Sequence, residues 1–149
     1  METEIQIIQA NRIDDLLALI SVFEDVFEME KFVVPSQTHL QKLLNNEHFL
    51  AVVAKSKEKV IAGLTVYVLD QYYSEKPIAH IYDLAVSTSY QRKGIGSKLI
   101  AFANEICKQS GFEEVFVQAE KDDDYAIDFY RSTKPAEELE AVHFSYKFT

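Results

Sequence analysis

The sequence predicts a single α/β (α+β) domain, residues 1–149, in which helices flank a mixed, mostly antiparallel central sheet. Segments of alternating or β-branched residues take turns with segments whose apolar residues recur at helical spacing. The chain is 48% hydrophobic and 26% charged, which suits one domain with a sizeable core. No repeat, linker or low-complexity tract divides it.

Composition and charge exclude several classes of protein. A net charge of -9 argues against nonspecific nucleic-acid binding and is compatible with a cationic partner. The single cysteine, Cys107, cannot form an internal disulfide, and we expect it to be a buried, inert thiol. No apolar run has membrane-spanning length and the N-terminus does not resemble a signal peptide, so we expect a cytoplasmic protein without a membrane partner. The four histidines are scattered, so no metal site is expected.

The first half of the chain predicts one strand, two helices and then two further strands. Residues 4–9 alternate as a short strand, and residues 11–15 supply capping residues for a helix over 16–27. Pro35 ends that segment, and a short helix is expected over 38–45. Residues 49–54 and 60–69 are predicted to form a hairpin. Within it, Gly63 indicates a bulge, a close backbone approach or simply a weak point in the strand.

The second half predicts a strand, a helix, a strand, a helix and a last strand. The strands are expected over 78–86 and 114–119, and Gly111 caps the helix that lies between them. Three aspartates, 122–124, precede the next helix, and one of them is expected to be its N-cap. Residues 142–148 alternate with Val142, Phe144, Tyr146 and Phe148 on one face, which predicts a final strand.

The segment from Tyr90 to Lys98 predicts a site for phosphate. A polar loop with Gly94 and Gly96 follows a strand and opens a helix, where backbone N–H groups and the helix dipole favour an anion. Glycines permit close approach to the backbone, and Arg92, Lys93 and Lys98 add positive charge in an otherwise acidic chain. The loop is neither a dinucleotide fingerprint, because Leu99 replaces the third glycine, nor a Walker A loop.

The motif Gln91-Arg92-Lys93-Gly94-Ile95-Gly96, directly after Leu84-Ala85-Val86, resembles the acetyl-CoA motif of the GNAT (GCN5-related) N-acetyltransferases. The element order resembles the GNAT fold over nearly the whole chain, so the resemblance implies a GNAT-like acyl-CoA N-acyltransferase fold. Further segments look like the aminoglycoside 3-N-acetyltransferase type I (gentamicin acetyltransferase) branch, namely 81–86, 117–120, 123–124 and 129–130. The implied co-substrate is acetyl-CoA, and the implied cofactor-binding residues are Leu84, Ala85, Val86, Gln91, Arg92, Lys93, Gly94, Ile95, Gly96, Ser97 and Lys98.

Acetyl transfer to an amine needs a base for the amine, a donor for the thioester carbonyl and an acid for the leaving thiolate. The resemblance assigns the donor to backbone amides near Ala85 and Val86, and the acid to Tyr130, which on sequence alone would be a core aromatic. Asp83, expected on the face opposite Tyr82 and Leu84, is a candidate base. A carboxylate within an apolar run either faces a solvated cleft or accepts hydrogen bonds from a neighbouring loop. His80, an acidic residue near Glu120 and water remain alternative bases.

An acidic group near the end of the fifth strand indicates the acceptor. Helix capping explains one or two of Glu120, Asp123 and Asp124, and the others, with Asp83, suit a substrate with several ammonium groups. The hypothesis is acetylation of a small polycation, with the aminoglycoside 3-amino group as one candidate. Polyamines or other metabolite amines are the alternative substrates. A noncatalytic acyl-CoA-binding module is the alternative function, because Arg131 to Pro135 departs from the family pattern. The resemblance also implies a homodimer.

Overall fold

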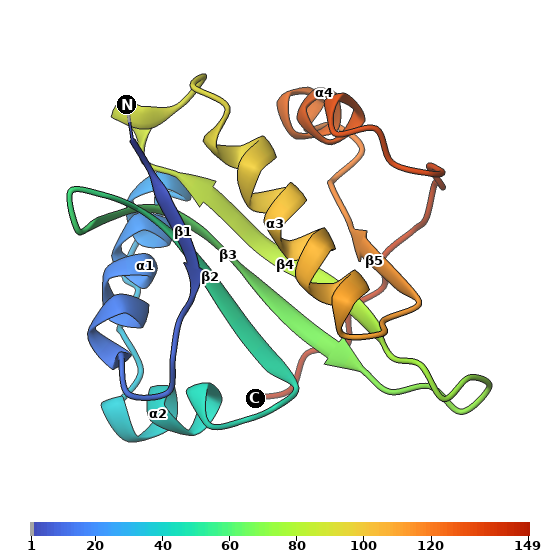
Figure 1. Ribbon diagram of the computed structural model, residues 1–149, viewed down its shortest axis with the longest axis horizontal. Coiled ribbons are helices and arrows are strands. Elements are labelled where there is room, and N and C mark those ends of the chain that lie inside the picture. The colour runs from blue at the N-terminus through green and yellow to red at the C-terminus, as the bar shows by residue number, and fades with distance from the viewer. Residues whose placement is uncertain (1) are drawn as a thin grey trace. The chain divides into compact units, whose positions relative to one another are not determined.

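The structure is a computed structural model that describes residues 2–149, and its elements follow the predicted order up to the last segment (Figure 1). The elements are β1 (Glu4–Ile7), α1 (Ile13–Val26), α2 (Gln37–Leu44), β2 (Phe49–Ser56), β3 (Lys59–Leu69), β4 (Ile78–Val86), the 3₁₀ turn η1 (Thr88–Tyr90), α3 (Ile95–Gln109), β5 (Glu114–Val117) and α4 (Asp124–Ser132). Two compact units result, Met1–Gln118 with the sheet and Ala119–Thr149 with α4.

Helices α1 and α2 begin where a nearby side chain satisfies a backbone N–H group or carries negative charge. Ser36 precedes α2 and its side chain accepts from the His39 N–H at 3.2 Å. The expected side-chain cap of α1 is absent, because the helix begins at Ile13 after Arg12 and places Asp14 and Asp15 inside its first turn. There the two carboxylates favour the helix through its dipole.

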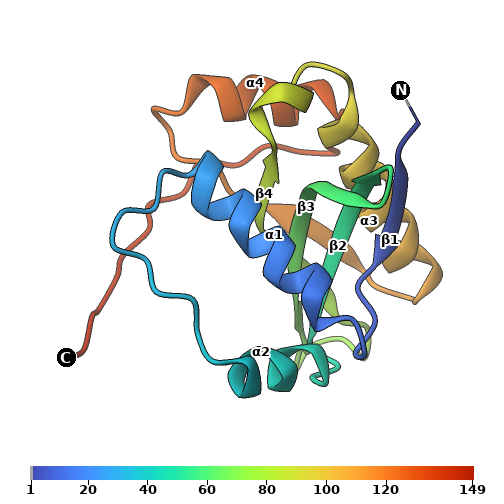
Figure 2. The same ribbon diagram turned by 90° about the vertical axis from the view of Figure 1, so that its left-hand side faces the viewer.

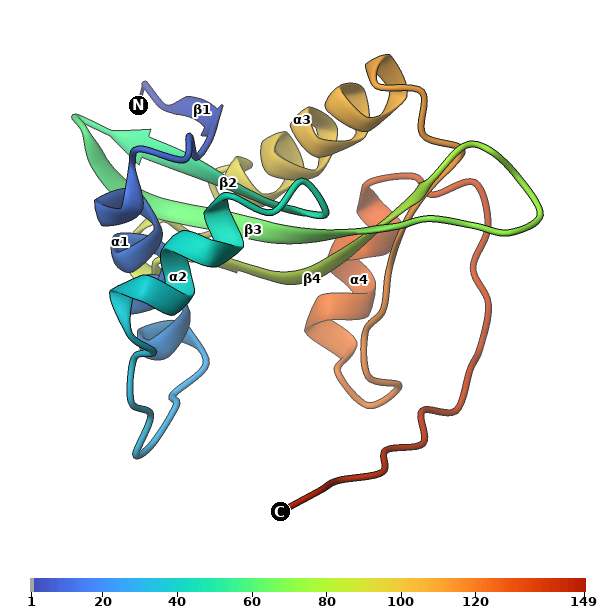
Figure 3. The ribbon, with the colours of Figure 1, turned by 90° about the horizontal axis from the view of Figure 1, so that it is seen from below.

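Within residues 2–118, the strands form one sheet in the order β1-β2-β3-β4-β5. The pairs from β1 to β4 are antiparallel, and β4 and β5 are parallel because α3 provides the crossover between them. The predicted mixed, mostly antiparallel sheet is therefore confirmed. Helices α1 and α2 lie on one face of the sheet (Figure 2) and α3 lies on the other (Figure 3).

Gly63 marks a close approach between the sheet and α1. A Cβ built at this position would lie 2.5 Å from Leu19 Cδ1 and 2.5 Å from the Val52 carbonyl oxygen. Leu19 is fully buried. Of the readings of Gly63 that the sequence left open, the close backbone approach is confirmed, since no larger side chain fits between β3 and α1.

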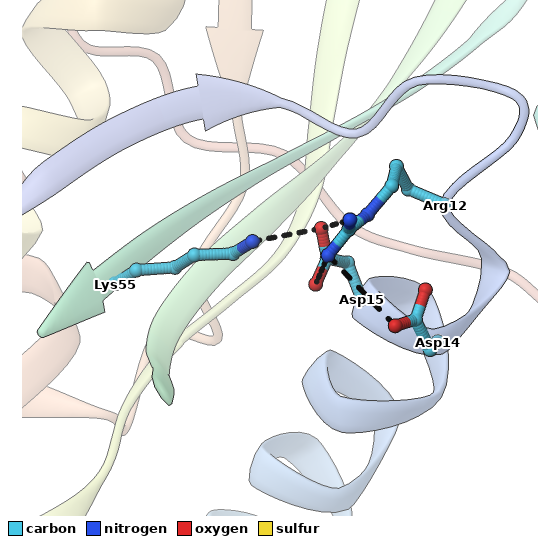
Figure 4. Close-up of polar contacts among 4 residues, drawn as sticks. All are labelled: Arg12, Asp14, Asp15 and Lys55. Carbon is cyan, nitrogen blue, oxygen red and sulfur yellow. Dashed lines mark hydrogen bonds and ion pairs between the residues drawn. The ribbon is translucent and has the colours of Figure 1, made fainter. Parts of the chain in front are cut away.

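An ion-pair cluster joins the start of α1 to β2 (Figure 4). Lys55 Nζ lies 3.0 Å from Asp15 Oδ2, and these side chains are only 12% and 8% exposed. Arg12 Nε lies 3.4 Å from the same Asp15 oxygen, and its guanidinium also reaches Asp14 at 3.8 Å. The buried Asp15 carboxylate is thus compensated by two cations, one of them half exposed.

Two predicted strands are shorter in the structure, and one is missing. β1 ends at Ile7 and β5 at Val117, two residues before the predicted ends. The prediction of a strand over 142–148 is wrong, because residues 133–149 contain no helix or strand. Alternation fixes the two faces of a strand, but a strand also needs a neighbour for its backbone hydrogen bonds. The four apolar side chains stay exposed, namely Val142, Phe144, Tyr146 and Phe148.

Among residues 2–149, no helix is long and apolar enough to cross a bilayer.

Candidate active site

The predicted phosphate loop lies between the end of β4 and the start of α3. After η1, Gln91 donates from Nε2 to the Val86 carbonyl at 2.9 Å, which fixes the loop against the strand that precedes it. Gly94 takes a left-handed conformation, φ 81°, and α3 starts at Ile95 with no side-chain cap. The first-turn N–H groups therefore have no side chain of the loop as acceptor, which is the requirement for holding an anion.

The surroundings of this helix start are open and basic. Arg92, Lys93 and Lys98 are exposed, and Lys93 Nζ lies 5.7 Å from the centroid of the Tyr90 ring. A Cβ built at Gly94 would meet no atom within 4 Å. The residues present fit a phosphate group, since uncapped N–H groups, a left-handed glycine and basic side chains gather at one helix end.

The neighbouring strands part beside this loop. The parallel pairing of β4 with β5 ends at Ile81 and Val117, whereas β4 continues to Val86. On its β5 side, the described segment 82–86 therefore has no strand partner. This opening includes Leu84, Ala85 and Val86, and their backbone groups lie at the edge where the sequence predicted a splayed strand.

Asp83 lies in a β-bulge. The register pairs Leu64 with Leu84 and Val66 with Ile81, so two residues of β4, Tyr82 and Asp83, oppose the single residue Thr65. The Asp83 N–H donates to Thr65 Oγ1 at 3.2 Å. The bulge explains how a charged residue is accommodated within the strand.

The bulge also changes the face on which Asp83 lies. Alternation forward from Ile81 and backward from Leu84 puts Tyr82 and Asp83 on one face, the face on which Gly63 meets α1. Burial raises the pKa of the Tyr67 phenol on that face, and the charge of Asp83 adds to the rise. The predicted position opposite Leu84 is therefore confirmed, and the position opposite Tyr82 is wrong, because the extra residue interrupts the alternation.

Burial tunes the two candidate bases of β4 in opposite directions. Asp83 is partly buried, and desolvation raises its pKa above the ordinary value of 3.8. Desolvation lowers the pKa of His80, whose ring is stacked on Phe116 at a centroid distance of 4.4 Å. Both shifts favour the neutral form of the side chain, and the raised pKa makes Asp83 a stronger base than a solvated aspartate.

The second unit carries the remaining candidates. Tyr130 lies near the end of α4, partly buried, with its ring in contact with Phe129 at 5.0 Å. Asp123 is the N-cap of α4, accepting from the Ala126 N–H at 3.0 Å, which confirms that one of the three aspartates caps this helix. Glu120 and Asp124 are exposed. Because Asp83 belongs to the other unit, its meeting with these residues in one site stays a prediction.

Other side chains are outside the candidate chemistry. Cys107 is buried in α3, and burial raises the pKa of its thiol, as expected of an inert cysteine. No group of three metal-ligating side chains gathers among the described residues. Sequence reasoning missed the aromatic neighbours of Asp83, above all Tyr67, because only strand register brings them beside β4.

Comparison with known proteins assigns the fold. The model of the acetyltransferase (GNAT) family matches residues 16–133. The aminoglycoside acetyltransferase meta-AAC0020, from an uncultured soil metagenomic sample and solved with trehalose and with sisomicin, is 54% identical with a TM-score of 0.97, covering 99% of this chain and 97% of that chain. HMB0005, another aminoglycoside acetyltransferase from such a sample, is 28% identical with a TM-score of 0.92, covering both chains fully at 100%.

A more distant structure shares the fold alone. The aminoglycoside N-acetyltransferase AAC(6')-Iy, solved in complex with CoA, is 15% identical with a TM-score of 0.75, covering 98% of this chain and 100% of that chain. The match to the family model extends over most of the chain and includes the bulged strand, the phosphate loop and Tyr130. The chain belongs to the acetyltransferase (GNAT) family.

Proposed function

We propose that this protein transfers the acetyl group of acetyl-CoA to a primary amine of an aminoglycoside, at its 3-amino group. The observation that carries the proposal is the form of β4, which has an open edge beyond Ile81 and a partly buried carboxylate in its bulge, and which leads through η1 and the glycine loop to an uncapped helix start. The relatives that are 54% and 28% identical are named aminoglycoside acetyltransferases, which supports the acceptor class. The choice of the 3-amino group rests on the branch resemblance in the sequence.

The donor is expected to bind along the open edge of β4 and the loop after it. The pyrophosphate accepts hydrogen bonds from the first-turn N–H groups of α3, and the nearby basic side chains offset its charge. Backbone groups at the parted edge hold the acyl arm and polarise the thioester carbonyl. The proposed residues are Leu84, Ala85, Val86, Gln91, Arg92, Lys93, Gly94, Ile95, Gly96, Ser97 and Lys98.

The proposed chemistry is direct transfer. The amine nitrogen attacks the thioester carbonyl carbon, Asp83 takes the proton that the amine loses, and the C–S bond breaks to leave an amide and a thiolate. Tyr130 donates its phenolic proton to that thiolate, which leaves as CoA. Asp83 suits its role because its raised pKa increases its basicity and its position in the bulge sets it beside the open edge.

The acceptor's positive charge suits the acidic side chains of the chain. Asp83 offers one carboxylate on β4, and Glu120, Asp123 and Asp124 offer three around the start of α4. Asp123 Oδ1 caps α4 by accepting from the Ala126 N–H, and the negative charge of Asp123 still attracts a cationic acceptor. Several ammonium groups on one acceptor would be held by separate carboxylates, each in a charge-assisted hydrogen bond.

A thiol-release assay with acetyl-CoA and a panel of amines tests the function. We expect turnover with sisomicin, and NMR of the product to place the acetyl group on the 3-amino nitrogen. Turnover of linear polyamines but of no aminoglycoside would contradict the proposed acceptor and show that the acceptor is a linear polyamine. Tight acetyl-CoA binding by calorimetry without transfer to any amine would instead support a noncatalytic acyl-CoA-binding module.

Asp83→Asn tests the assignment of the base. We expect kcat to fall by about 100-fold, since general base catalysis contributes roughly 10²–10⁴. Glu114→Gln, on the exposed end of β5, is the matched control and keeps full activity. If Asp83→Asn retains wild-type kcat across the pH range, then His80, an acidic residue near Glu120 or water is the base.

We also propose that the protein is a homodimer, with the C-terminal segment adding to a sheet edge of a second copy. The segment alternates as a strand does, yet its apolar side chains are exposed by 76% at Val142, 76% at Phe144, 84% at Tyr146 and 93% at Phe148. Pairing would bury them and satisfy the backbone. Light scattering tests this with Phe144→Asp in the full-length chain, which we expect to be monomeric; His143→Asp, on the alternate face, is the control.

A further inference from the structure

One register line of the sheet is aromatic on the face that carries Asp83. Phe49 pairs with Tyr67, Tyr67 with His80, and His80 with Phe116, so these rings cross four strands from β2 to β5. Tyr82, in the bulge, lies between two of them, with centroids 5.6 Å from Tyr67 and 5.6 Å from His80. Phe49 meets Tyr67 at 5.5 Å and His80 meets Phe116 at 4.4 Å. These five residues are called the aromatic row below.

The aromatic row is buried at one end and open in the middle. Phe49 is 6% exposed and belongs to the core cluster that includes Leu40 of α2. Tyr67 is 38% exposed and Tyr82 is 61% exposed, although both are in contact with other rings. Packed rings that remain open on a sheet face indicate a surface that binds, since such apolar surface is otherwise buried. At ~4.8 Å per strand, the row spans about 14 Å, more than one saturated six-membered ring.

Charge and shape define what fits this surface. Asp83 lies beside Tyr82 in the bulge, and its charge helps to raise the pKa of the Tyr67 phenol, so a carboxylate borders the rings. Aromatic faces attract cations and pack against flat apolar faces. A rigid ring that bears ammonium groups offers both features at once. A linear polyamine offers cations without a flat face and loses more conformational freedom when it is held.

We propose that the aromatic row is the surface on which a ring-shaped polycationic acceptor lies, with Tyr67 and Tyr82 as the residues that favour cyclic over linear polyamines. This inference rests on the proposed function and deepens it, because it names the side chains that select the acceptor. The acceptor's ring faces contact the two tyrosine rings, and its ammonium group reaches Asp83 at the edge of the row.

The ratio of kcat/KM for sisomicin to kcat/KM for spermidine measures this selection. We expect Tyr82→Leu to lower the ratio about tenfold through the KM for sisomicin, the size expected for loss of an aromatic contact with a cation. Tyr82→Phe keeps the ring and keeps most of the ratio. Tyr73→Leu, an exposed tyrosine outside the row, is the matched control. Circular dichroism and thermal unfolding establish that each variant is folded.

Calorimetry separates this inference from the proposed function. With CoA-saturated protein, we expect sisomicin to bind about tenfold more weakly to Tyr82→Leu than to wild type. If wild type binds sisomicin, Tyr82→Leu binds it more weakly, and wild type acetylates no amine, the inference about the aromatic row is supported and the proposed function fails. A second outcome would overturn the inference about the aromatic row and leave the proposed function standing. In it, wild type acetylates sisomicin, and the folded variants Tyr82→Leu and Tyr67→Leu have the same kcat/KM ratio and the same affinity for sisomicin as wild type.

Discussion

Replacing Lys55 by methionine tests the ion-pair cluster between α1 and β2. The change keeps most of the length and of the apolar stem of the side chain but removes the cation that lies 3.0 Å from Asp15. Breaking a buried pair by removing one partner costs about 3–5 kcal/mol, because a charge is left buried. Arg12 remains 3.4 Å from the same carboxylate, so we expect the lower end, about 3 kcal/mol. For a chain of this size, this corresponds to a fall in Tm of roughly 6–12 °C.

Urea and thermal unfolding, followed by circular dichroism, measure the effect. Lys59→Met is the matched control, since Lys59 is exposed in the same hairpin, and we expect its free energy of unfolding to change by less than about 0.5 kcal/mol. The double variant Asp15→Leu/Lys55→Met removes both charges and is expected to recover to within about 1 kcal/mol of wild type. A loss below about 1 kcal/mol for Lys55→Met, with an unchanged m-value, would refute the reasoning.

Three further predictions follow from packing, burial and chemistry. Gly63→Ala forces a Cβ to 2.5 Å from Leu19 Cδ1 and the Val52 carbonyl oxygen, and we expect the free energy of unfolding to fall by about 1–3 kcal/mol in urea titrations. Burial raises the pKa of Asp83 above 3.8 in the folded state. Stability is therefore lost as the pH rises from 3.8, the pKa in the unfolded chain, through the higher pKa of the folded state. Asp83→Asn is thus expected to have a higher Tm than wild type at pH 7 and the same Tm well below pH 3.8, where the carboxyl is protonated in both states, whereas an equal Tm at pH 7 would contradict the burial argument. Tyr130→Phe is expected to lower kcat about 100-fold at saturating acetyl-CoA, and unchanged turnover would remove its role as the acid.

Local patterns were sufficient for most of the fold. The β-branched and aliphatic runs of β2, β3 and β4 and the helical spacing of α1 and α3 follow from which side chains must face a core, and that requirement is visible in the sequence. The glycine loop could also be predicted from the sequence, because a left-handed backbone conformation before a helix favours glycine, and Gly94 has that conformation. The C-terminal alternation misled for a physical reason, since a period of two records a strand's faces and not the presence of a partner strand.

By itself, the sequence determined the acidic single chain, the order of its elements up to α4 and the phosphate loop that resembles the acetyl-CoA motif of the GNAT family. Only the tertiary structure showed that Gly63 lets α1 pack closely against β3 and that the pairing of β4 with β5 ends at Ile81. It also showed that a bulge places Asp83 on the same face as Tyr82. It also decided that four strands bring their rings into one row. These features depend on strand register and on contacts between residues distant in the chain, which no local period encodes.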